Sequence, residues 1–354
     1  MAEREHIGAL AVHFTAGVAA GTLLVRFHLP PYPLAAGLLP VLGTLLAVIL
    51  RKGRSDLLFP VFLLCGAFAA LNGSFTGPDE GIALRVCGPA EKLRGLIDGI
   101  PFPTGSTAPL LKAFLTGDRS GLSRDTVRIF RESGASHLLA LSGLHIGILY
   151  MLLSRLLWPI GNSPAAKGVR YAVTLLAAGG FTLMTGASPS IVRAFLFILL
   201  NETARLTGRP RQPVRVLSTA LLIQLVLSPQ SIASTGFQLS YLAMTGIFLV
   251  YPHLEAWYPE GPRFDPVRKI WQAAALSISC QLFTGPLAWL RFGSFPVYFL
   301  ITNLLAMPLT TLLMATGTAA VALQGMGWCP PILTEVTDRL CSLLLFVLET
   351  IASL

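Results

Sequence analysis

Long apolar stretches recur from the start of the chain to its end, and short polar segments separate most of them. A helix needs about 20 predominantly apolar residues to cross the hydrocarbon core of a bilayer. The pattern therefore predicts an all-α polytopic membrane protein. The eleven expected spans are residues 7–25, 33–50, 57–72, 138–158, 169–187, 190–206, 214–228, 236–252, 270–290, 296–323 and 335–354.

One long segment, residues 73–137, is too polar to span. In its second half, from Leu110 to Phe130, leucine and phenylalanine alternate with charged residues, which is typical of short amphipathic helices on a membrane surface. Ile82 to Val86 would fit one short strand, and the Pro- and Gly-rich residues 101–109 predict a loop. The expected regions are N-terminal spans (1–72), a reduced external segment (73–137) and a transmembrane core (138–354).

Composition supports this architecture, because 53% of the 354 residues are apolar and only 12% are charged, against about 25% charged in soluble domains. The net charge of +9 has two explanations: a nucleic-acid partner, or loops that orient the protein in the membrane. With the N-terminus inside the cell, basic residues gather in the inner loops, as the positive-inside rule requires. Those loops are residues 51–56, 155–170, 205–215 and 251–269.

Two spans carry polar or small residues that do not fit a lipid-facing helix. Ser142 and His145 lie three residues apart and so share a face of the span 138–158. Gly143 and Gly147 have the small-xxx-small spacing that permits close helix packing. Arg193 lies about one turn inside the span 190–206, and no acidic residue lies at comparable depth to pair with it.

Three later spans show the same feature. Gln238 and Tyr241 belong to a polar stripe in span 236–252, and Gln281 to another in span 270–290. Asn303 and Pro308 interrupt span 296–323 and predict a kink or a broken helix. No span carries an acidic residue near its middle, although ion-coupled transporters usually need one.

Polar side chains at membrane depth have two interpretations. Singly, each is best explained by hydrogen bonding between helices. Together, on five helices, they favour a hydrated interior lined by Ser142, His145, Arg193, Gln238, Tyr241, Gln281 and Asn303.

Catalysis is not expected. The chain has no G-x-x-x-x-G-K-[ST] nucleotide motif, and its histidines and cysteines lack metal-ligand spacing, so no metal or cofactor is expected. Ser142 and His145 could be a nucleophile and its base, but two residues three apart on one helix seldom align for proton transfer, and no orienting third group is evident.

Four motifs, in order, resemble those of the ComEC competence-protein family. They are FRESGASHLLALSGLHIG (Phe130–Gly147), GASPSIVRA (Gly186–Ala194), SPQSIASTGFQLSYLAMTGI (Ser228–Ile247) and ITNLLAMPL (Ile301–Leu309). The resemblance covers about residues 105–354 and, more loosely, the first three spans.

The resemblance implies a channel that imports single-stranded transforming DNA across the bacterial inner (plasma) membrane. A cytoplasmic helicase-like ATPase would drive the strand, and an external DNA receptor or nuclease would supply it. Family members usually carry an external OB-type domain, which residues 73–137 are too short to hold, and many carry a metallo-β-lactamase-like domain that is not found before Leu354. Two alternatives stay open: a small-molecule or lipid-linked transporter that shares the fold, and a non-conducting membrane scaffold.

Overall fold

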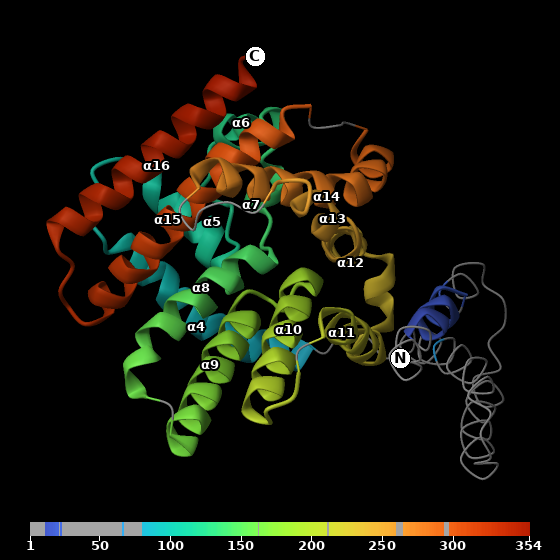
Figure 1. Ribbon diagram of the computed structural model, residues 1–354. Coiled ribbons are helices and arrows are strands. Elements are labelled where there is room, and N and C mark those ends of the chain that lie inside the picture. Colours follow the sequence, from blue (N-terminus) through green and yellow to red (C-terminus); the bar gives the residue numbers. More distant parts are fainter. Residues whose placement is uncertain are drawn as a thin grey trace, which may run out of the picture. The chain divides into compact units, whose positions relative to one another are not determined.

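The computed structural model describes residues 11–20, 22, 66, 80–161, 163–210, 212–259, 265–293 and 297–354. Within these ranges the structure is all-helical and contains no strand (Figure 1). The expected span 33–50 lies outside the described residues. The span 57–72 is described only at Gly66, and the span 7–25 only at residue 22 and at a short apolar helix, Ala11–Ala20.

Each later expected span overlaps one long helix. These helices are α8 (Gly143–Leu156), α9 (Pro164–Met184), α10 (Pro189–Leu206), α11 (Pro213–Leu227), α12 (Thr235–Leu249), α14 (Pro266–Phe292), α15 (Phe299–Gly325) and α16 (Pro331–Ala352). Helices α9, α11, α14 and α16 each begin at a proline. Proline suits a first helical position because its φ is already helical and its missing N–H would have no partner there.

Three of the described helical segments are long and apolar enough to cross a membrane: Gly143–Ile160, Pro266–Phe292 and Phe299–Gly325. The first of them combines α8 with the short 3₁₀ helix η2 (Trp158–Ile160). Helix α10 is too charged for the same criterion, since it contains Arg193, Glu202 and Arg205. The predicted number of eleven spans is therefore not confirmed, although the described residues form an all-α structure with three helices of membrane-spanning length and composition.

The chain forms two compact units. The first comprises residues 1–81 and 196–240, and the second comprises residues 82–195 and 241–354. The second unit also holds α4 (Glu80–Asp98, from Ile82 on), α5 (Thr107–Thr116), α6 (Arg124–Glu132), α7 (Ser136–Leu139) and α13 (Tyr251–Glu255). A 3₁₀ helix, η3 (Pro229–Ala233), lies in the first unit.

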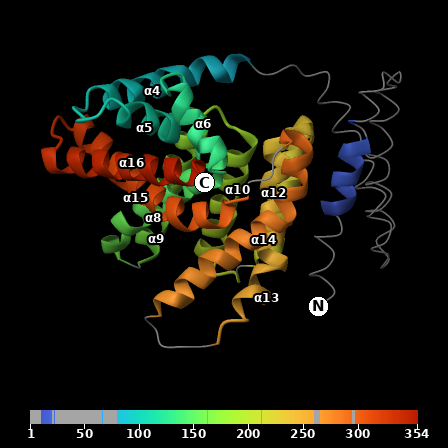
Figure 2. The same ribbon diagram turned by 90° about the horizontal axis from the view of Figure 1, so that it is seen from above.

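The core of the second unit lies where α5 and α6 pack against α15 and α16 (Figures 1 and 2). Phe114 of α5 and Phe130 of α6 are fully buried there and meet edge to face, with ring centroids 6.5 Å apart. Leu313 of α15 and Leu344 of α16 close the same cluster. The core therefore joins helices from the middle of the sequence to the last two helices.

Helix α5 differs from the amphipathic surface helix expected in this part of the chain. Seven of its ten residues are buried, including Leu110, Leu111 and Phe114. The Leu111 side chain of α5 packs against Gly317 of α15. A Cβ atom built on Gly317 would lie 2.4 Å from Leu111 Cδ2. Helix α6 keeps the one-sided pattern, with Phe130 as its only buried residue.

Two other local expectations can be compared with the helices. Ile82 to Val86 belong to α4 and form no strand, because a continuous helix runs from Glu80 to Asp98. Helix α15 is not broken, since it continues through Asn303 and Pro308, and the kink at Pro308 stays a prediction. The break in a membrane helix lies elsewhere, between α7 and α8.

A buried carboxylate ties the loop before α5 to α16. Asp338 Oδ1 accepts hydrogen bonds from the Thr104 hydroxyl (2.6 Å), the Thr104 amide (3.1 Å) and the Thr107 hydroxyl (2.6 Å). Asp338 is 5% exposed, so these donors replace the water that its charge would otherwise need. This bond set fixes where α5 enters the core.

Helices α12 and α14 touch through their backbones (Figure 2). A Cβ on Gly246 of α12 would lie only 2.2 Å from the carbonyl oxygen of Ser279 in α14. Glycine is therefore required at this position for the two helices to come this close. The contact lies entirely within the second unit.

Candidate functional site

The motif around Ser142 interrupts a predicted membrane helix. Helix α7 ends at Leu139, Ala140 is extended, and α8 begins at Gly143. Ser142, with φ −128° and ψ 169°, is the N-cap of α8. The span expected at 138–158 is thus two helices, and the positive end of α8 lies inside the expected span.

Ser142 and His145 form a capping box at the start of α8. The Ser142 hydroxyl accepts a hydrogen bond from the Leu144 amide (3.3 Å), and the Ser142 amide donates to His145 Nδ1 (3.1 Å). Because Nδ1 is an acceptor, the hydrogen of the neutral imidazole is on Nε2. The spacing of serine and histidine is thereby explained by helix capping.

Removing the Ser142 hydroxyl is expected to destabilise this helix start. We expect Ser142→Ala to lower the free energy of unfolding by about 1 kcal/mol, the usual loss for a missing N-cap. Ser142→Asp, which can also cap, should retain most of the stability. Thermal unfolding of the purified protein in detergent would measure both, and equal stability of alanine and wild type would contradict the capping role.

Arg193 of α10 lies against the start of α8. A Cβ atom built on Gly143 would lie 3.2 Å from Arg193 Nη2 and 3.2 Å from the methyl carbon of Ala194. The guanidinium carbon lies 5.9 Å from the centroid of the Tyr241 ring of α12. Arg193 is only 8% exposed. Three helices therefore meet around one buried positive charge.

The buried guanidinium has no carboxylate partner within the described ranges, where every acid–base pair within 4 Å involves other residues. Its Nη1 atom has no hydrogen-bond partner there either. Cys280 of α14 lies within electrostatic reach of the same charge. A cation without a counter-ion at this depth is costly unless water or an anion reaches it.

Contacts between residues of the second unit connect five helices in a closed series. Gly143 joins α8 to α10, the Tyr241 ring joins α10 to α12, and Gly246 joins α12 to α14. Helix α14 packs on α15, and α15 packs on α8. The predicted site residues Ser142, His145, Arg193, Tyr241, Gln281 and Asn303 lie on these five helices or at their caps.

Asn303 and Gln281 have mixed surroundings. Asn303 Nδ2 donates to the Ser277 hydroxyl of α14 (3.4 Å), a hydrogen bond of the kind that joins helices. Asn303 Oδ1 and Gln281 Nε2 are buried and unpartnered among the residues that the structure describes. Whether these atoms line a common path with Arg193 stays a prediction.

Two predicted residues are placed differently. Gln238 lies in the first unit, and its Nε2 atom donates to the nearby Ile232 carbonyl (2.8 Å). A Cβ on Gly147 would meet no described atom within 4 Å, so no described helix approaches it closely. Of the two glycines in α8, Gly143 alone lies against another helix among the residues that the structure describes.

The comparisons with known proteins decide the family. The profile of the Competence protein family matches residues 114–354, from α5 to the end of α16. The chain belongs to the competence protein family. The family predicted from the four motifs is thus confirmed.

Curated relatives of this competence protein are distant. The chain is 25% identical over 219 residues to ComE operon protein 3 of Bacillus subtilis, covering 62% of this chain and 26% of the relative. It is 26% identical over 218 residues to Recombination protein 2 of Haemophilus influenzae, covering 58% and 27%. The chain thus spans about a quarter of the length of these relatives. No solved structure matches it significantly.

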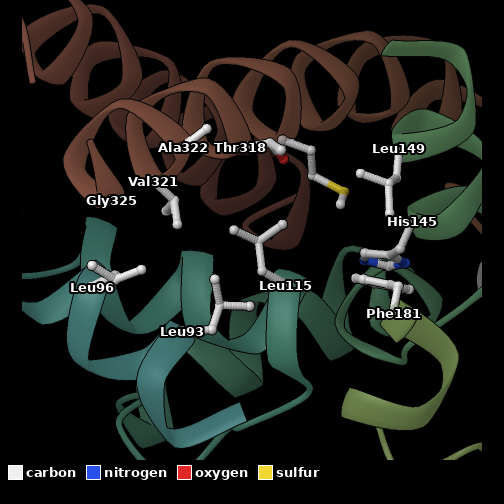
Figure 3. A pocket seen from close by; sticks show the side chains of 11 residues that line it. Leu93, Leu96, Leu115, His145, Leu149, Phe181, Thr318, Val321, Ala322 and Gly325 are labelled. Carbon is white, nitrogen blue, oxygen red and sulfur yellow. The ribbon is translucent and has the colours of Figure 1, made fainter. Parts of the chain in front are cut away.

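An apolar cavity of about 340 Å³ lies beside the capping box of this competence protein (Figure 3). His145 and Phe181 lie at one end, and Leu96 and Gly325 at the other. His145 is fully buried, its ring packs edge-on against Phe114, and its Nε2 atom has no described partner. His145 could be predicted from the sequence but the cavity could not, because its other lining residues are mostly apolar and come from four further helices that sequence order does not bring together.

Proposed function

We propose that this competence protein forms the membrane part of a channel that admits single-stranded DNA to the bacterial cytoplasm. Eleven helices cross the inner membrane in this proposal, with the N-terminus in the cytoplasm. The chain moves the strand without changing its covalent structure. A cytoplasmic helicase-like ATPase pulls the strand inward, and an external receptor or nuclease delivers it.

The observation that carries this proposal is a set of buried polar atoms without described partners on helices linked in a closed series. They are His145 Nε2, Arg193 Nη1, Gln281 Nε2, Asn303 Oδ1 and Thr310 Oγ1. An unpaired buried polar group costs about 1–3 kcal/mol, and more if charged. Five of them on one set of helices are best satisfied by water or by a polar strand between the helices.

The signs of the charges also favour a polyanion. Arg193 offers a guanidinium that can bind phosphate. No acidic side chain pairs with it within the described ranges. A path for DNA needs cationic and hydrogen-bonding groups, whereas a carboxylate would repel the phosphates.

A planar bilayer that contains the purified protein tests the proposal without the ATPase. A voltage of about 100 mV gives each unit charge about 2.3 kcal/mol, which replaces the pull of the motor. We expect an ionic current that falls while an oligothymidylate occupies the protein, and amplifiable strand in the far chamber. A duplex of the same length should not cross. If no strand crosses at either polarity, the channel proposal is wrong.

A transformation assay tests the same proposal in cells. Arg193→Ala should lower the uptake of DNA while the amount of protein in the membrane stays normal, because only the buried charge is lost. Arg155→Ala, an exposed arginine at the end of α8, serves as the control and should have little effect. Unchanged transformation by the Arg193 variant at normal expression would count against the channel.

The apolar cavity favours a second candidate, the small-molecule or lipid-linked transporter. Its volume of about 340 Å³ lies within the range of small-ligand sites, about 300–1,000 Å³. His145, one of its lining residues, has an unpartnered Nε2 atom that could donate to a carbonyl or hydroxyl oxygen of such a molecule, and Thr318 adds a hydroxyl group to the lining. The bilayer experiment separates the candidates, since this transporter would pass no DNA strand.

A further inference from the structure

The surroundings of Arg193 combine two sources of positive potential. The start of α8 carries about half a positive charge from its aligned peptide dipoles. The Arg193 guanidinium touches the first residue of that helix, Gly143. Two positive groups in contact repel each other, and burial strengthens this repulsion because little water screens it. The arrangement is stable only if an anion or water lies between or beside them.

The contacts of the guanidinium leave a donor for that anion. Its carbon lies 5.9 Å from the centroid of the Tyr241 ring, and a cation–π contact does not use an N–H group as a conventional hydrogen bond does. Arg193 is 8% exposed, and its Nη1 atom has no described hydrogen-bond partner. Its Nη2 atom is the one that lies beside Gly143. A buried donor of this side chain is therefore available to a ligand that lies near the start of α8.

We infer that Arg193 and the N-terminus of α8 form a binding site for one phosphodiester group. A guanidinium binds phosphate oxygens through parallel N–H donors, and helix N-termini bind phosphate through their dipole. Gly143 leaves the space in front of the guanidinium open, since any larger side chain would fill it. The inference rests on the proposed function in one respect: the intended phosphodiester is that of the DNA backbone.

A phospholipid headgroup offers the same chemistry as the DNA backbone. Both present a singly charged phosphodiester, and both can reach a site at membrane depth. The contacts around Arg193 therefore define the class of ligand, and competition between the two sources distinguishes them. Dimethyl phosphate serves as the smallest probe of that class.

Two glycines of α8 provide a matched pair of variants. Gly143→Val places methyl groups against the guanidinium without removing its charge, because a Cβ there would lie 3.2 Å from Nη2. Gly147→Val makes the same change one turn later, where no described atom lies within 4 Å. A loss of binding caused by the first and not by the second locates the site at the start of α8.

The experiment is calorimetric titration of the purified, delipidated protein with dimethyl phosphate and with oligothymidylate. Arg193→Ala and Gly143→Val should weaken both ligands roughly 10- to 100-fold, the loss of one charge-assisted hydrogen-bonding pair. Arg193→Lys should retain part of the affinity, and Gly147→Val all of it. Size-exclusion profiles and unfolding temperatures must show that each variant is folded; Arg193→Lys carries the test if the alanine variant is not.

Competition identifies the source of the phosphate. If phosphatidylglycerol in nanodiscs displaces dimethyl phosphate and oligothymidylate does not, the site exists but holds a lipid headgroup, and its assignment to DNA is wrong. Wild-type affinity in Arg193→Ala, or equal losses in Gly143→Val and Gly147→Val, would overturn the site itself. If these variants contradict the site but a DNA strand still crosses the bilayer with the wild-type protein, the site is wrong and the channel proposal stands. If the site binds phosphodiester but no strand crosses, the site stands and the channel proposal is wrong.

Discussion

Replacing Gly246 by alanine is expected to lower the thermal unfolding temperature of the purified protein more than almost any other single-atom addition. The new Cβ would lie 2.2 Å from the Ser279 carbonyl oxygen and 2.9 Å from Cδ2 of Phe283. A backbone atom cannot rotate away as a side chain can, so α12 and α14 must separate. Overpacking of this kind costs about 1–3 kcal/mol, and a backbone clash belongs at the upper end.

The control for this prediction is Gly180→Ala in α9. Gly180 also lies inside a helix, but no described atom lies within 4 Å of its Cβ position. Alanine favours a helix over glycine by about 0.5–1 kcal/mol, so this variant should be neutral or more stable. Opposite signs for the two substitutions are expected in detergent melts. A Gly246 variant as stable as wild type would show that α12 and α14 are not in backbone contact.

Removing the Asp338 carboxylate is expected to have the second large effect. Its Oδ1 atom accepts three hydrogen bonds from Thr104 and Thr107, and hydrogen bonds to charged groups contribute about 1.5–3 kcal/mol each. Asp338→Ala removes the acceptor that these donors share and opens a gap in the core. We expect the free energy of unfolding to fall by about 3 kcal/mol, with the loop at 101–106 becoming sensitive to protease.

Two further variants test whether the effect comes from the Asp338 carboxylate or from any change in α16. Asp338→Asn keeps one acceptor oxygen and should lose about half as much stability. Glu335→Ala, one turn earlier, removes an exposed carboxylate paired with Arg339 and should change stability by less than about 1 kcal/mol. We expect the unfolding temperature to be highest for Glu335→Ala, lower for Asp338→Asn and lowest for Asp338→Ala. Equal effects of the two alanine variants would show that Thr104 and Thr107 do not depend on Asp338.

The positions of the long helices could be predicted from the sequence because each rests on an apolar run of nearly bilayer length. Helices α9 to α12 and α14 to α16 begin and end within a few residues of the expected spans. The break at 140–142 was not predicted, because the capping box of Ser142 and His145 lies within an otherwise apolar run. A hydropathy pattern averages over several residues and does not reveal such a break, whereas the hydrogen bonds of the capping box determine where α8 begins.

Tertiary contacts explain what the sequence did not reveal. Leu110, Leu111 and Phe114 form an apolar stripe that fits either a membrane surface or a protein core, and only the presence of α15 and α16 selects the core. Asp338 was overlooked because its partners, Thr104 and Thr107, lie more than 230 residues earlier in the chain.

In the candidate site, the position of one polar residue agrees with the prediction from the sequence and that of another does not. Arg193 could be singled out from the sequence because an arginine inside an apolar span is rare, and the structure places it beside Gly143 and Tyr241. Gln238 had an equally polar sequence context but bonds locally to Ile232. Composition and spacing identify polar residues at membrane depth; they do not tell which of them face one another.

The bond between Asp338 and the loop before α5 has a consequence for biosynthesis. Ribosomes add about 5–20 residues per second, so α16 follows Thr107 by on the order of 10 to 50 s. For most of that interval the apolar side of α5 has neither α15 nor α16 to cover it. The nascent chain must shelter this helix in lipid, at the translocon or with a chaperone until synthesis of α16 lets the core close.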